Sequence, residues 1–178
     1  TAFDIDSLTY VDQKLNVPLF KISSGENLTK DLIEYIAQQN KPILLSTGMT
    51  SFEEIGMSLS VLNSHGKKNI TILHCVSNYP AKDTEINLKN LESLKERFNC
   101  SIGYSDHSLG NEACIAAVTM GAKVIEKHVT FDRNAEGPDH KASSTITEFE
   151  QLVISIRRVE KMLGQKEKTF SDQEKKIR

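Results

Sequence analysis

Short apolar segments alternate with longer segments of helical spacing along most of the chain, and this alternation restricts the fold more than any other feature. The short segments have the length of strands and predict strands at residues 20–24, 43–47, 70–75, 101–105 and 123–130. The longer segments repeat apolar residues every three or four positions and predict helices at residues 28–39, 51–64, 88–98, 111–120 and 147–163. Alternating strands and helices form βαβ units with right-handed crossovers, so we predict an α/β fold with a parallel sheet.

Residues that favour helix starts support these boundaries. Ser51 and Glu54 have the spacing of a capping box at the second helix. Thr29 or Asn27 is a candidate cap for the first helix. The last helix is predicted to begin at Thr147, with glutamates in its first turn.

Polar side chains gather where the predicted strands end. They are Lys21, Ser24, Ser46, Thr47, His74, Ser77, Ser105, His107, Glu126 and His128. In an open doubly wound sheet only the switch point carries such residues, whereas in a (β/α)₈ TIM barrel every strand end faces one mouth. We therefore predict a TIM-barrel-type fold. Five strands cannot close a barrel of eight, so residues 1–163 are expected to hold only the C-terminal five or so strand/helix units.

The ends of the chain also suggest a piece of a longer protein. The first residues read as the tail of a strand, and about three barrel strands are expected upstream of Thr1. Residues 164–178 are polar, have no apolar face and are predicted to be a linker toward a further domain.

Charge and cysteine content exclude several classes of protein. The net charge is −2 with both signs interspersed, which argues against a nucleic-acid-binding surface. No apolar run reaches the roughly 18–20 residues that span a bilayer, so no membrane association is expected. The three cysteines form no Cys-x-x-Cys pair, and reduced thiols in a cytoplasmic protein are the simplest interpretation.

Two histidines are candidate metal ligands. His107 and His128 end adjacent predicted strands, so their imidazoles could converge on one divalent ion. Two protein ligands leave positions open for water or substrate, as in catalytic sites, and Mn²⁺, Mg²⁺ and Zn²⁺ all suit them. The simpler alternative is a pair of hydrogen-bonded histidines at the barrel rim. His74 is a possible third member of the site, or else a core histidine beneath it.

Lys21 lies within a predicted strand, where a charge is costly unless it meets an anion. Together with Ser24, Ser46 and Ser105 it would form a cradle for phosphate or carboxylate, although each serine alone is typical of a turn. Glu26 is a candidate general base or proton donor. Asp139 follows a Gly-Pro turn that could aim it over the mouth, unless the loop is simply an acidic surface loop.

At this point the chain resembles the bacterial sialic acid synthase (N-acetylneuraminate synthase) family. The matching motifs follow one another in order over nearly the whole chain: Thr1–Asp4, Phe20–Asn27, Leu45–Met49, Leu73–Cys75, Tyr79–Pro80, Gly103–His107, Glu126–Thr130 and Glu136–Ser143. The resemblance implies a TIM barrel that condenses phosphoenolpyruvate with an open-chain N-acetylmannosamine-type aldehyde. The products are phosphate and a nine-carbon 2-keto sugar acid, used in sialic acid and surface polysaccharide biosynthesis.

The resemblance also assigns roles to single residues. It implies His107 and His128 as metal ligands, with Mn²⁺ the usual ion and Mg²⁺ possible. It implies a phosphoenolpyruvate pocket, a catalytic carboxylate and groups that contact the sugar. The pocket residues are Lys21, Ser24, Ser46 and Ser105, and the catalytic carboxylate is Glu26. The groups that contact the sugar are Tyr79 and Asp139, and Asp139 is also counted as catalytic. Ser77 lies at a position where some members carry a substrate-binding asparagine.

Family members form homodimers in the cytoplasm and carry a small C-terminal antifreeze-like domain that completes the partner's site. We therefore expect the 178 residues alone to turn over little or no substrate. Phosphate release above background from phosphoenolpyruvate and N-acetylmannosamine would contradict that expectation.

Three alternatives stay open at this stage. The acceptor could be the 6-deoxy di-N-acetylated sugar of legionaminic or pseudaminic acid synthases, with the Gly137–Ser143 loop closer to sialic and legionaminic members. Other phosphoenolpyruvate-condensing barrels make keto-deoxy sugar acids, but those that use a metal usually include a cysteine ligand. A non-catalytic remnant that binds a phosphorylated metabolite or a partner chain is the third.

Overall fold

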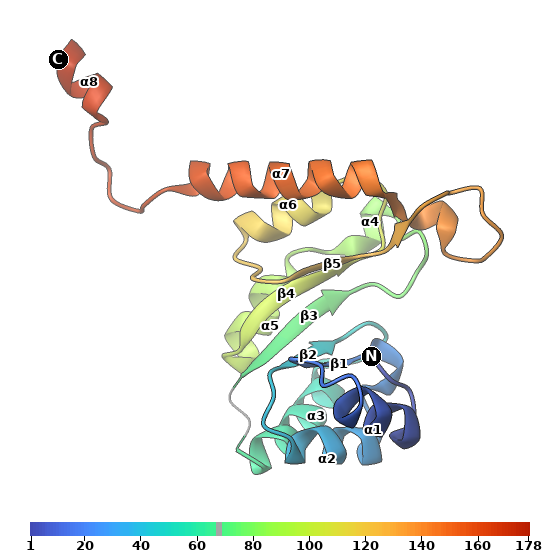
Figure 1. The fold of residues 1–178 in the computed structure, drawn as a ribbon. Helices are drawn as coiled ribbons and strands as arrows, with labels where there is room; N and C mark the ends of the chain where they lie inside the picture. Colours follow the sequence, from blue (N-terminus) through green and yellow to red (C-terminus); the bar gives the residue numbers. More distant parts are fainter. Residues whose placement is uncertain (67–68) are drawn as a thin grey trace.

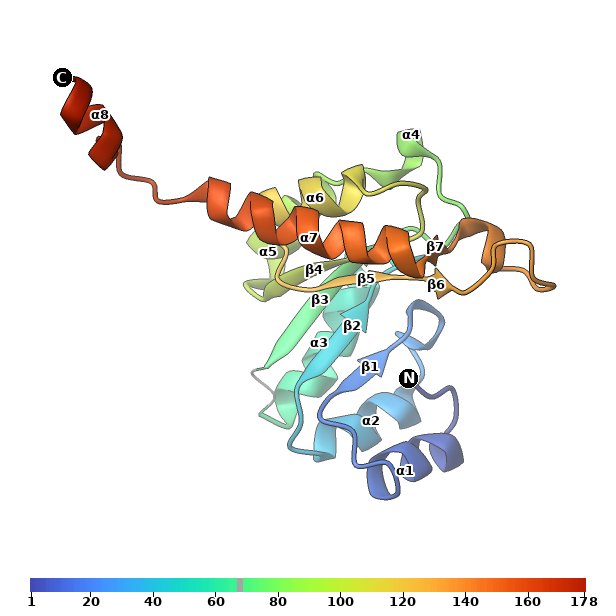
Figure 2. The same ribbon diagram turned by 45° about the horizontal axis from the view of Figure 1, so that its top comes forward.

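The computed structural model describes residues 1–66 and 69–178, in which a strongly curved parallel sheet carries helices on its outer side (Figures 1 and 2). Five strands lie in chain order, and every neighbouring pair is parallel. The strands are β1 Phe20–Ile22, β2 Ile43–Ser46, β3 Ile70–Cys75, β4 Ser101–Asp106 and β5 Ile125–Lys127. The predicted fold class is confirmed, since this curled sheet with its helices is a half-barrel.

Helices follow the strands and cover the convex side of the sheet. In Figure 1 α2 and α3 lie below β1 and β2, whereas α5, α6 and α7 lie along β3 to β5. The helices are α1 Ile5–Gln13, α2 Lys30–Gln38, α3 Phe52–Ser64, α4 Asp83–Ile86, α5 Asn90–Phe98, α6 Glu112–Thr119, α7 Ile146–Leu163 and α8 Asp172–Ile177. Two single turns of 3₁₀ helix are η1 Ser24–Glu26 and η2 His140–Ala142.

Alternation along the strands separates the core from the functional side. Apolar residues that point toward the helices, such as Ile22, Leu45 and Tyr104, belong to the buried core. Their sequence neighbours point to the concave side, and these include Lys21 and Ser105. Parallel strands begin at one edge and end at the other, so the polar strand ends meet at a single edge of the half-barrel.

Helix caps agree with the predictions at one helix and correct them at two others. Ser51 caps α3 in a reciprocal capping box, as predicted. Thr29 precedes α2, but its hydroxyl binds Glu26 instead of the helix backbone. The Asn27 prediction is wrong, because this side chain is buried and donates to the carbonyl oxygen of Ser46 at 2.8 Å. Helix α7 begins at Ile146, one residue before Thr147, and is capped by Thr145.

Two segments differ from their predicted form. The predicted strand at residues 123–130 is interrupted at His128, and β6 Val129–Thr130 pairs with β7 Ser144–Thr145 in a separate sheet. The polar segment 164–178 contains α8, whose capping box at Ser171 the composition did not reveal. In the described ranges no helix combines the length and apolar character needed to cross a membrane.

Candidate active site

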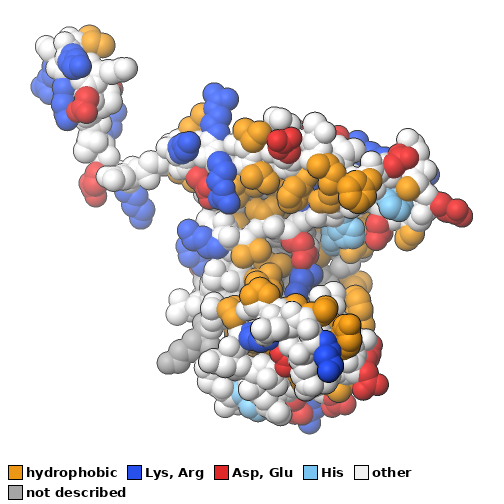
Figure 3. Space-filling model, viewed as in Figure 1, with side chains coloured by type: hydrophobic (Ala, Val, Ile, Leu, Met, Phe, Trp, Pro, Cys, Tyr) orange, Lys and Arg blue, Asp and Glu red, His pale blue; other side chains and the backbone are white. Residues whose placement is uncertain are grey.

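A cavity of about 710 Å³ opens at the carboxyl ends of the strands. The predicted substrate-binding residues and both predicted metal ligands line it together: Lys21, Ser24, Ser46, Ser77, Tyr79, Ser105, His107 and His128. Figure 3 shows histidine side chains at the surface below helix α7, beside acidic and basic side chains. The predicted residues therefore form one site, although they come from positions more than a hundred residues apart.

Lys21 reaches across the concave side from β1 to β5. Its Nζ lies 3.0 Å from Oε1 of Glu126 in a partly exposed ion pair. The Ser105 hydroxyl donates to the same Oε1 at 2.7 Å. Glu126 had no predicted role, yet strand alternation could have identified it, because it points to the side opposite Ile125 and Lys127.

Serine hydroxyls with free hydrogen-bonding capacity also line the cavity. Within the described part of the chain, the buried Oγ atoms of Ser46 and Ser23 have no hydrogen-bond partner. Ser24 Oγ accepts the backbone N–H of Gly48 at 3.0 Å, which leaves its proton free to point elsewhere. Buried hydroxyls normally find partners, so these atoms are suited to a polar ligand.

The two histidine rings lie close together beneath Tyr79. The ring centroids of His107 and His128 are 5.2 Å apart, and the Tyr79 ring lies 4.1 Å from that of His107. Nδ1 of His107 donates to the Val76 carbonyl oxygen at 2.7 Å, since a carbonyl can only accept. This bond leaves Nε2 as a lone-pair donor, which is how protein structures usually orient a metal-binding imidazole.

Burial keeps both imidazoles neutral. Desolvation lowers the pKa of His107, opposed by its bond to Val76 and by the nearby carboxylates. Desolvation also lowers the pKa of His128, with a further decrease from the proximity of His107. Neutral imidazoles are the form that binds a metal ion.

The chain supplies few ligands of its own. Among residues 1–66 and 69–178, no group of three or more His, Cys, Asp or Glu is arranged to hold a metal ion. Two imidazoles with free nitrogens fit a divalent ion whose other positions belong to water or substrate oxygen.

The two predicted catalytic carboxylates lie at the edge of the cavity and do not line it. Glu26 belongs to η1, and its Oε2 accepts the Thr29 hydroxyl at 2.5 Å. Asp139 is about half exposed, with Oδ2 3.8 Å from Nδ1 of His128. Their catalytic roles stay predictions.

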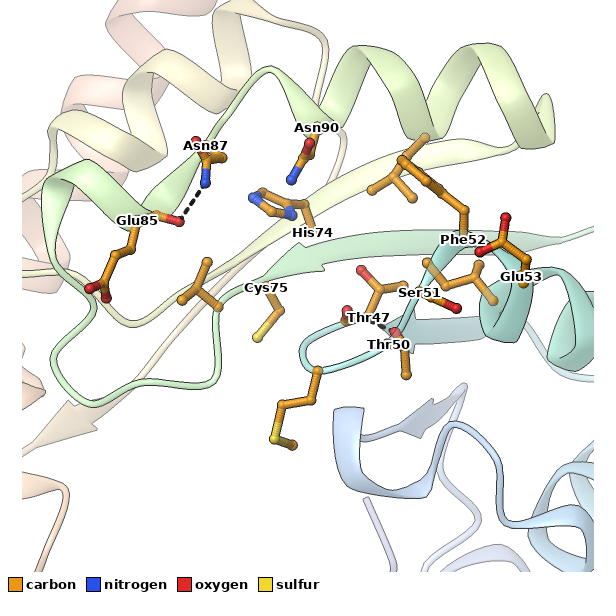
Figure 4. A pocket seen from close by; sticks show the side chains of 14 residues that line it. Thr47, Thr50, Ser51, Phe52, Glu53, His74, Cys75, Glu85, Asn87 and Asn90 are labelled. Carbon is orange, nitrogen blue, oxygen red and sulfur yellow. Dashed lines mark hydrogen bonds between the residues drawn. The ribbon is translucent and has the colours of Figure 1, made fainter.

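His74 does not join the cavity. Its Nε2 donates to the Ile86 carbonyl oxygen at 2.6 Å, and its ring stacks on Tyr104. Burial lowers its pKa, opposed by the bond to Ile86. It lines a neighbouring pocket of about 440 Å³ between the loop after β2 and helix α5, where Figure 4 shows Asn90 beside the ring.

Cys75 extends toward the main cavity, with Sγ 3.8 Å from Nδ1 of His107.

Comparisons with known proteins find relatives along nearly the whole chain. A profile described as the NeuB family matches residues 1–168. An N,N′-diacetyllegionaminic acid synthase of Campylobacter jejuni is 46% identical over 178 residues, which is 99% of this chain and 53% of the relative. An uncharacterised protein of Methanocaldococcus jannaschii is 48% identical over 163 residues, 90% of this chain and 48% of its own.

A solved structure is similar in fold. The N-acetylneuraminic acid (sialic acid) synthetase of Leptospira borgpetersenii, crystallised with citrate, superposes with a TM-score of 0.89 at 34% identity. The match covers 98% of this chain and 61% of that one. The chain thus spans about half the length of the curated relatives it matches.

Proposed function

Because the chain belongs to the NeuB family, we propose that its protein condenses phosphoenolpyruvate with an open-chain N-acetylmannosamine-type aldehyde, forming a nine-carbon 2-keto sugar acid and phosphate. The observation that carries the proposal is the meeting of Lys21, the strand-end serines and two neutral histidines in one cavity. A cytoplasmic homodimer with Mn²⁺, or Mg²⁺ in its place, belongs to the same proposal.

Lys21 and the serines are suited to the anionic substrate. The ammonium of Lys21 supplies a point charge, and Ser24, Ser46 and Ser105 supply hydroxyls around it. The unpartnered Oγ of Ser46 supports this role, because a phosphate or carboxylate oxygen would satisfy it. Ser105 must exchange Glu126 for the ligand in order to donate its proton, whereas the Lys21 ammonium can bind the anion with a further N–H.

His107 and His128 would hold the divalent ion, His107 through the Nε2 that its bond to Val76 leaves free. Such an ion supplies Lewis-acid stabilisation of the oxygen charge that develops as the aldehyde is attacked. Tyr79 and Ser77 lie beside the histidines and are suited to orient the sugar. The proximity of Asp139 to His128 supports a contact with the same sugar, and Glu26 is proposed to exchange protons from the cavity edge.

Phosphate release from phosphoenolpyruvate tests the proposal in the intact protein with Mn²⁺. We expect Lys21→Met to lower the rate by about a hundredfold or more, because the group that stabilises the leaving phosphate is lost. Lys41→Met is the matched control, since Lys41 binds Asp12 at 2.8 Å outside the cavity. Equal rates in both variants would contradict the proposed pocket.

The acceptor is proposed as N-acetylmannosamine. The similarity to the Campylobacter enzyme supports a second candidate, its 6-deoxy di-N-acetylated counterpart. Comparing kcat/KM for the two sugars decides between them. A non-catalytic remnant would release phosphate with neither. The expectation that the 178 residues alone have little or no turnover stays a prediction.

A further inference from the structure

A buried ion pair joins the two strand ends that lead into the histidines. Asp106 is the last residue of β4, Lys127 is the last residue of β5, and the two are register partners. Lys127 Nζ lies 2.6 Å from Asp106 Oδ2, and the two side chains are 2% and 0% exposed. The next residue after each is a candidate metal ligand, His107 or His128.

Asp106 has hydrogen-bond donors on both carboxylate oxygens. Oδ1 accepts the Tyr104 hydroxyl at 3.0 Å and both the N–H and the hydroxyl of Ser108, at 2.9 and 2.7 Å. Oδ2 accepts the Cys114 thiol at 3.1 Å in addition to Lys127. Lys127 also donates to the Ser108 carbonyl oxygen at 2.7 Å. A buried pair with its polar atoms satisfied in this way holds one geometry, and removing one partner strands a charge.

His128 depends on this pair more than His107 does. The carbonyl oxygens of both histidines accept a backbone N–H at 2.9 Å, from Ala81 at His107 and from Ser144 at His128. The ring of His107 is fixed in addition, through the bond from its Nδ1 to the Val76 carbonyl oxygen. The ring of His128 has Asp139 at 3.8 Å, beyond hydrogen-bond distance. Strand β5 has three residues, and the chain leaves the sheet at His128. The last residue held in the sheet before His128 is Lys127, through its pair with Asp106.

We propose that the Asp106–Lys127 pair is a positioning device that sets the separation of the His107 and His128 imidazoles. Asp106 and Lys127 are positioning residues. They act through the backbone, because their ion pair fixes the last register pair between β4 and β5. The inference rests on the proposed function in that the two imidazoles share one divalent ion.

Because Asp106 and Lys127 carry opposite charges, a positioning effect can be distinguished from a charge effect. The test is Mn²⁺ titration of the intact protein, with free Mn²⁺ measured by electron paramagnetic resonance. Asp106→Asn removes a negative charge near the ion, and Lys127→Met removes a positive one. A simple field effect would weaken binding in the first variant and strengthen it in the second. Positioning predicts about tenfold or greater weakening in both, the size typical of residues that orient metal ligands.

Asp12→Asn is the matched control, because it breaks a different ion pair, the partly buried one with Lys41 at 2.8 Å, which lies away from the histidines. We expect it to lower the urea midpoint and leave Mn²⁺ affinity unchanged. Lys127→Met keeps four of the donors to Asp106, so it serves as the folded variant if Asp106→Asn unfolds.

Parent-like Mn²⁺ affinity in a folded variant overturns the proposal, as does tighter binding by Lys127→Met. Failure of the proposed function is recognised separately: His107→Ala and His128→Ala would then bind Mn²⁺ with the same affinity as the parent protein. In that case the metal-free ring signals decide, measured by long-range ¹H–¹⁵N NMR. Positioning predicts that both variants shift the His107 and His128 ring resonances while Asp12→Asn does not, and unshifted rings overturn it.

Discussion

The backbone of Gly48 passes close to two serine side chains of the candidate active site. Its N–H donates to Ser24 Oγ, and a Cβ built on it would collide with Ser77 Oγ and lie 2.9 Å from Ser24 Oγ. Gly48→Ala is therefore expected to displace both hydroxyls. The loss of the Ser24 hydroxyl should weaken phosphoenolpyruvate binding by roughly tenfold, about the value of one hydrogen bond. Isothermal titration calorimetry measures the change.

Gly25→Ala is the control for that substitution. A Cβ at Gly25 meets no atom of the described residues within 4 Å, although Gly25 lines the same cavity. Its affinity should equal that of the parent. If Gly48→Ala also binds like the parent, the Ser24 hydroxyl does not hold phosphoenolpyruvate.

The composition of the site was largely predictable at the scale of single residues. Lys21, Ser46, Ser105 and His107 lie within one residue of the carboxyl ends of parallel strands, and these ends meet at one edge whatever the details of packing. Glu126 was not assigned a role, because its importance lies in a partner on a strand about a hundred residues away. Pairings of this kind depend on how far the sheet curls, which a pattern of apolar residues does not encode.

At the scale of elements, the loop that carries Asp139 is held at its base. Strands β6 and β7 close it, Arg133 Nε donates to the Ser143 carbonyl oxygen at 3.0 Å, and Arg133 Nη2 binds Glu148 Oε2 at 2.5 Å. Glu148 is also the capping-box residue of α7, where it accepts the Thr145 N–H at 2.8 Å. One arginine thus connects the loop to the first turn of the last long helix.

Arg133→Ala is expected to loosen residues 131–143 without unfolding the protein. The Arg133–Glu148 pair is partly exposed, so its loss should lower the free energy of unfolding by less than about 1 kcal/mol. Amide hydrogen exchange in the loop should nevertheless rise clearly, because both anchors of Arg133 disappear together. Mass spectrometry of exchanged peptides measures this effect.

Arg157→Ala is the matched control for the loop, since Arg157 binds Glu160 at 2.8 Å on the exposed side of α7. Exchange in residues 131–143 should stay at the parent rate in that variant. A parent-like rate in Arg133→Ala would mean that β6 and β7 alone hold the loop.

Element prediction succeeded where apolar periodicity is strong and failed where an element is short or polar. Strand β3 has the predicted bounds, since it is fully buried along its length. Helix α1 buries Leu8 alone, α4 has four residues, and α8 buries none, so a 3.6-residue pattern had little to act on. The break at His128 was missed because the alternation of apolar residues continues into β6. That alternation does not show that β6 pairs with β7 instead of extending β5.

At the scale of the whole molecule, the half-barrel encloses neutral imidazoles on both sides of its sheet. His107 lies on the concave side and His74 on the helical side, with 6% and 5% of their surface exposed. Burial lowers the pKa of both, and that of the more exposed His128 as well. The unfolded chain has ordinary imidazoles, with a pKa of about 6.5. It therefore takes up protons first as the pH falls.

This difference sets the sign of the pH dependence of stability. Below about pH 6.5 the unfolded state binds more protons than the folded state, so the free energy of unfolding must decrease as the pH falls. The stabilisation that the folded state gains from its neutral imidazoles is complete above that pH and is lost progressively below it. Each buried imidazole contributes a slope of at most about 1.4 kcal/mol per pH unit. Carboxylates with lowered pKa values, such as Asp106, add their own loss only in a more acidic range, below about pH 4.

Urea unfolding between about pH 7.5 and pH 5, with a chelator present to remove metal ions, measures this slope. His74→Gln should reduce the slope by the share of one imidazole, because glutamine does not titrate, even though the loss of packing lowers stability at every pH. His65→Gln is the control, since His65 is exposed beyond the end of α3. It should leave the slope unchanged. A parent slope of zero in this range would mean that the folded protein accepts protons on these rings as readily as the unfolded chain, and that burial does not keep the two candidate metal ligands neutral.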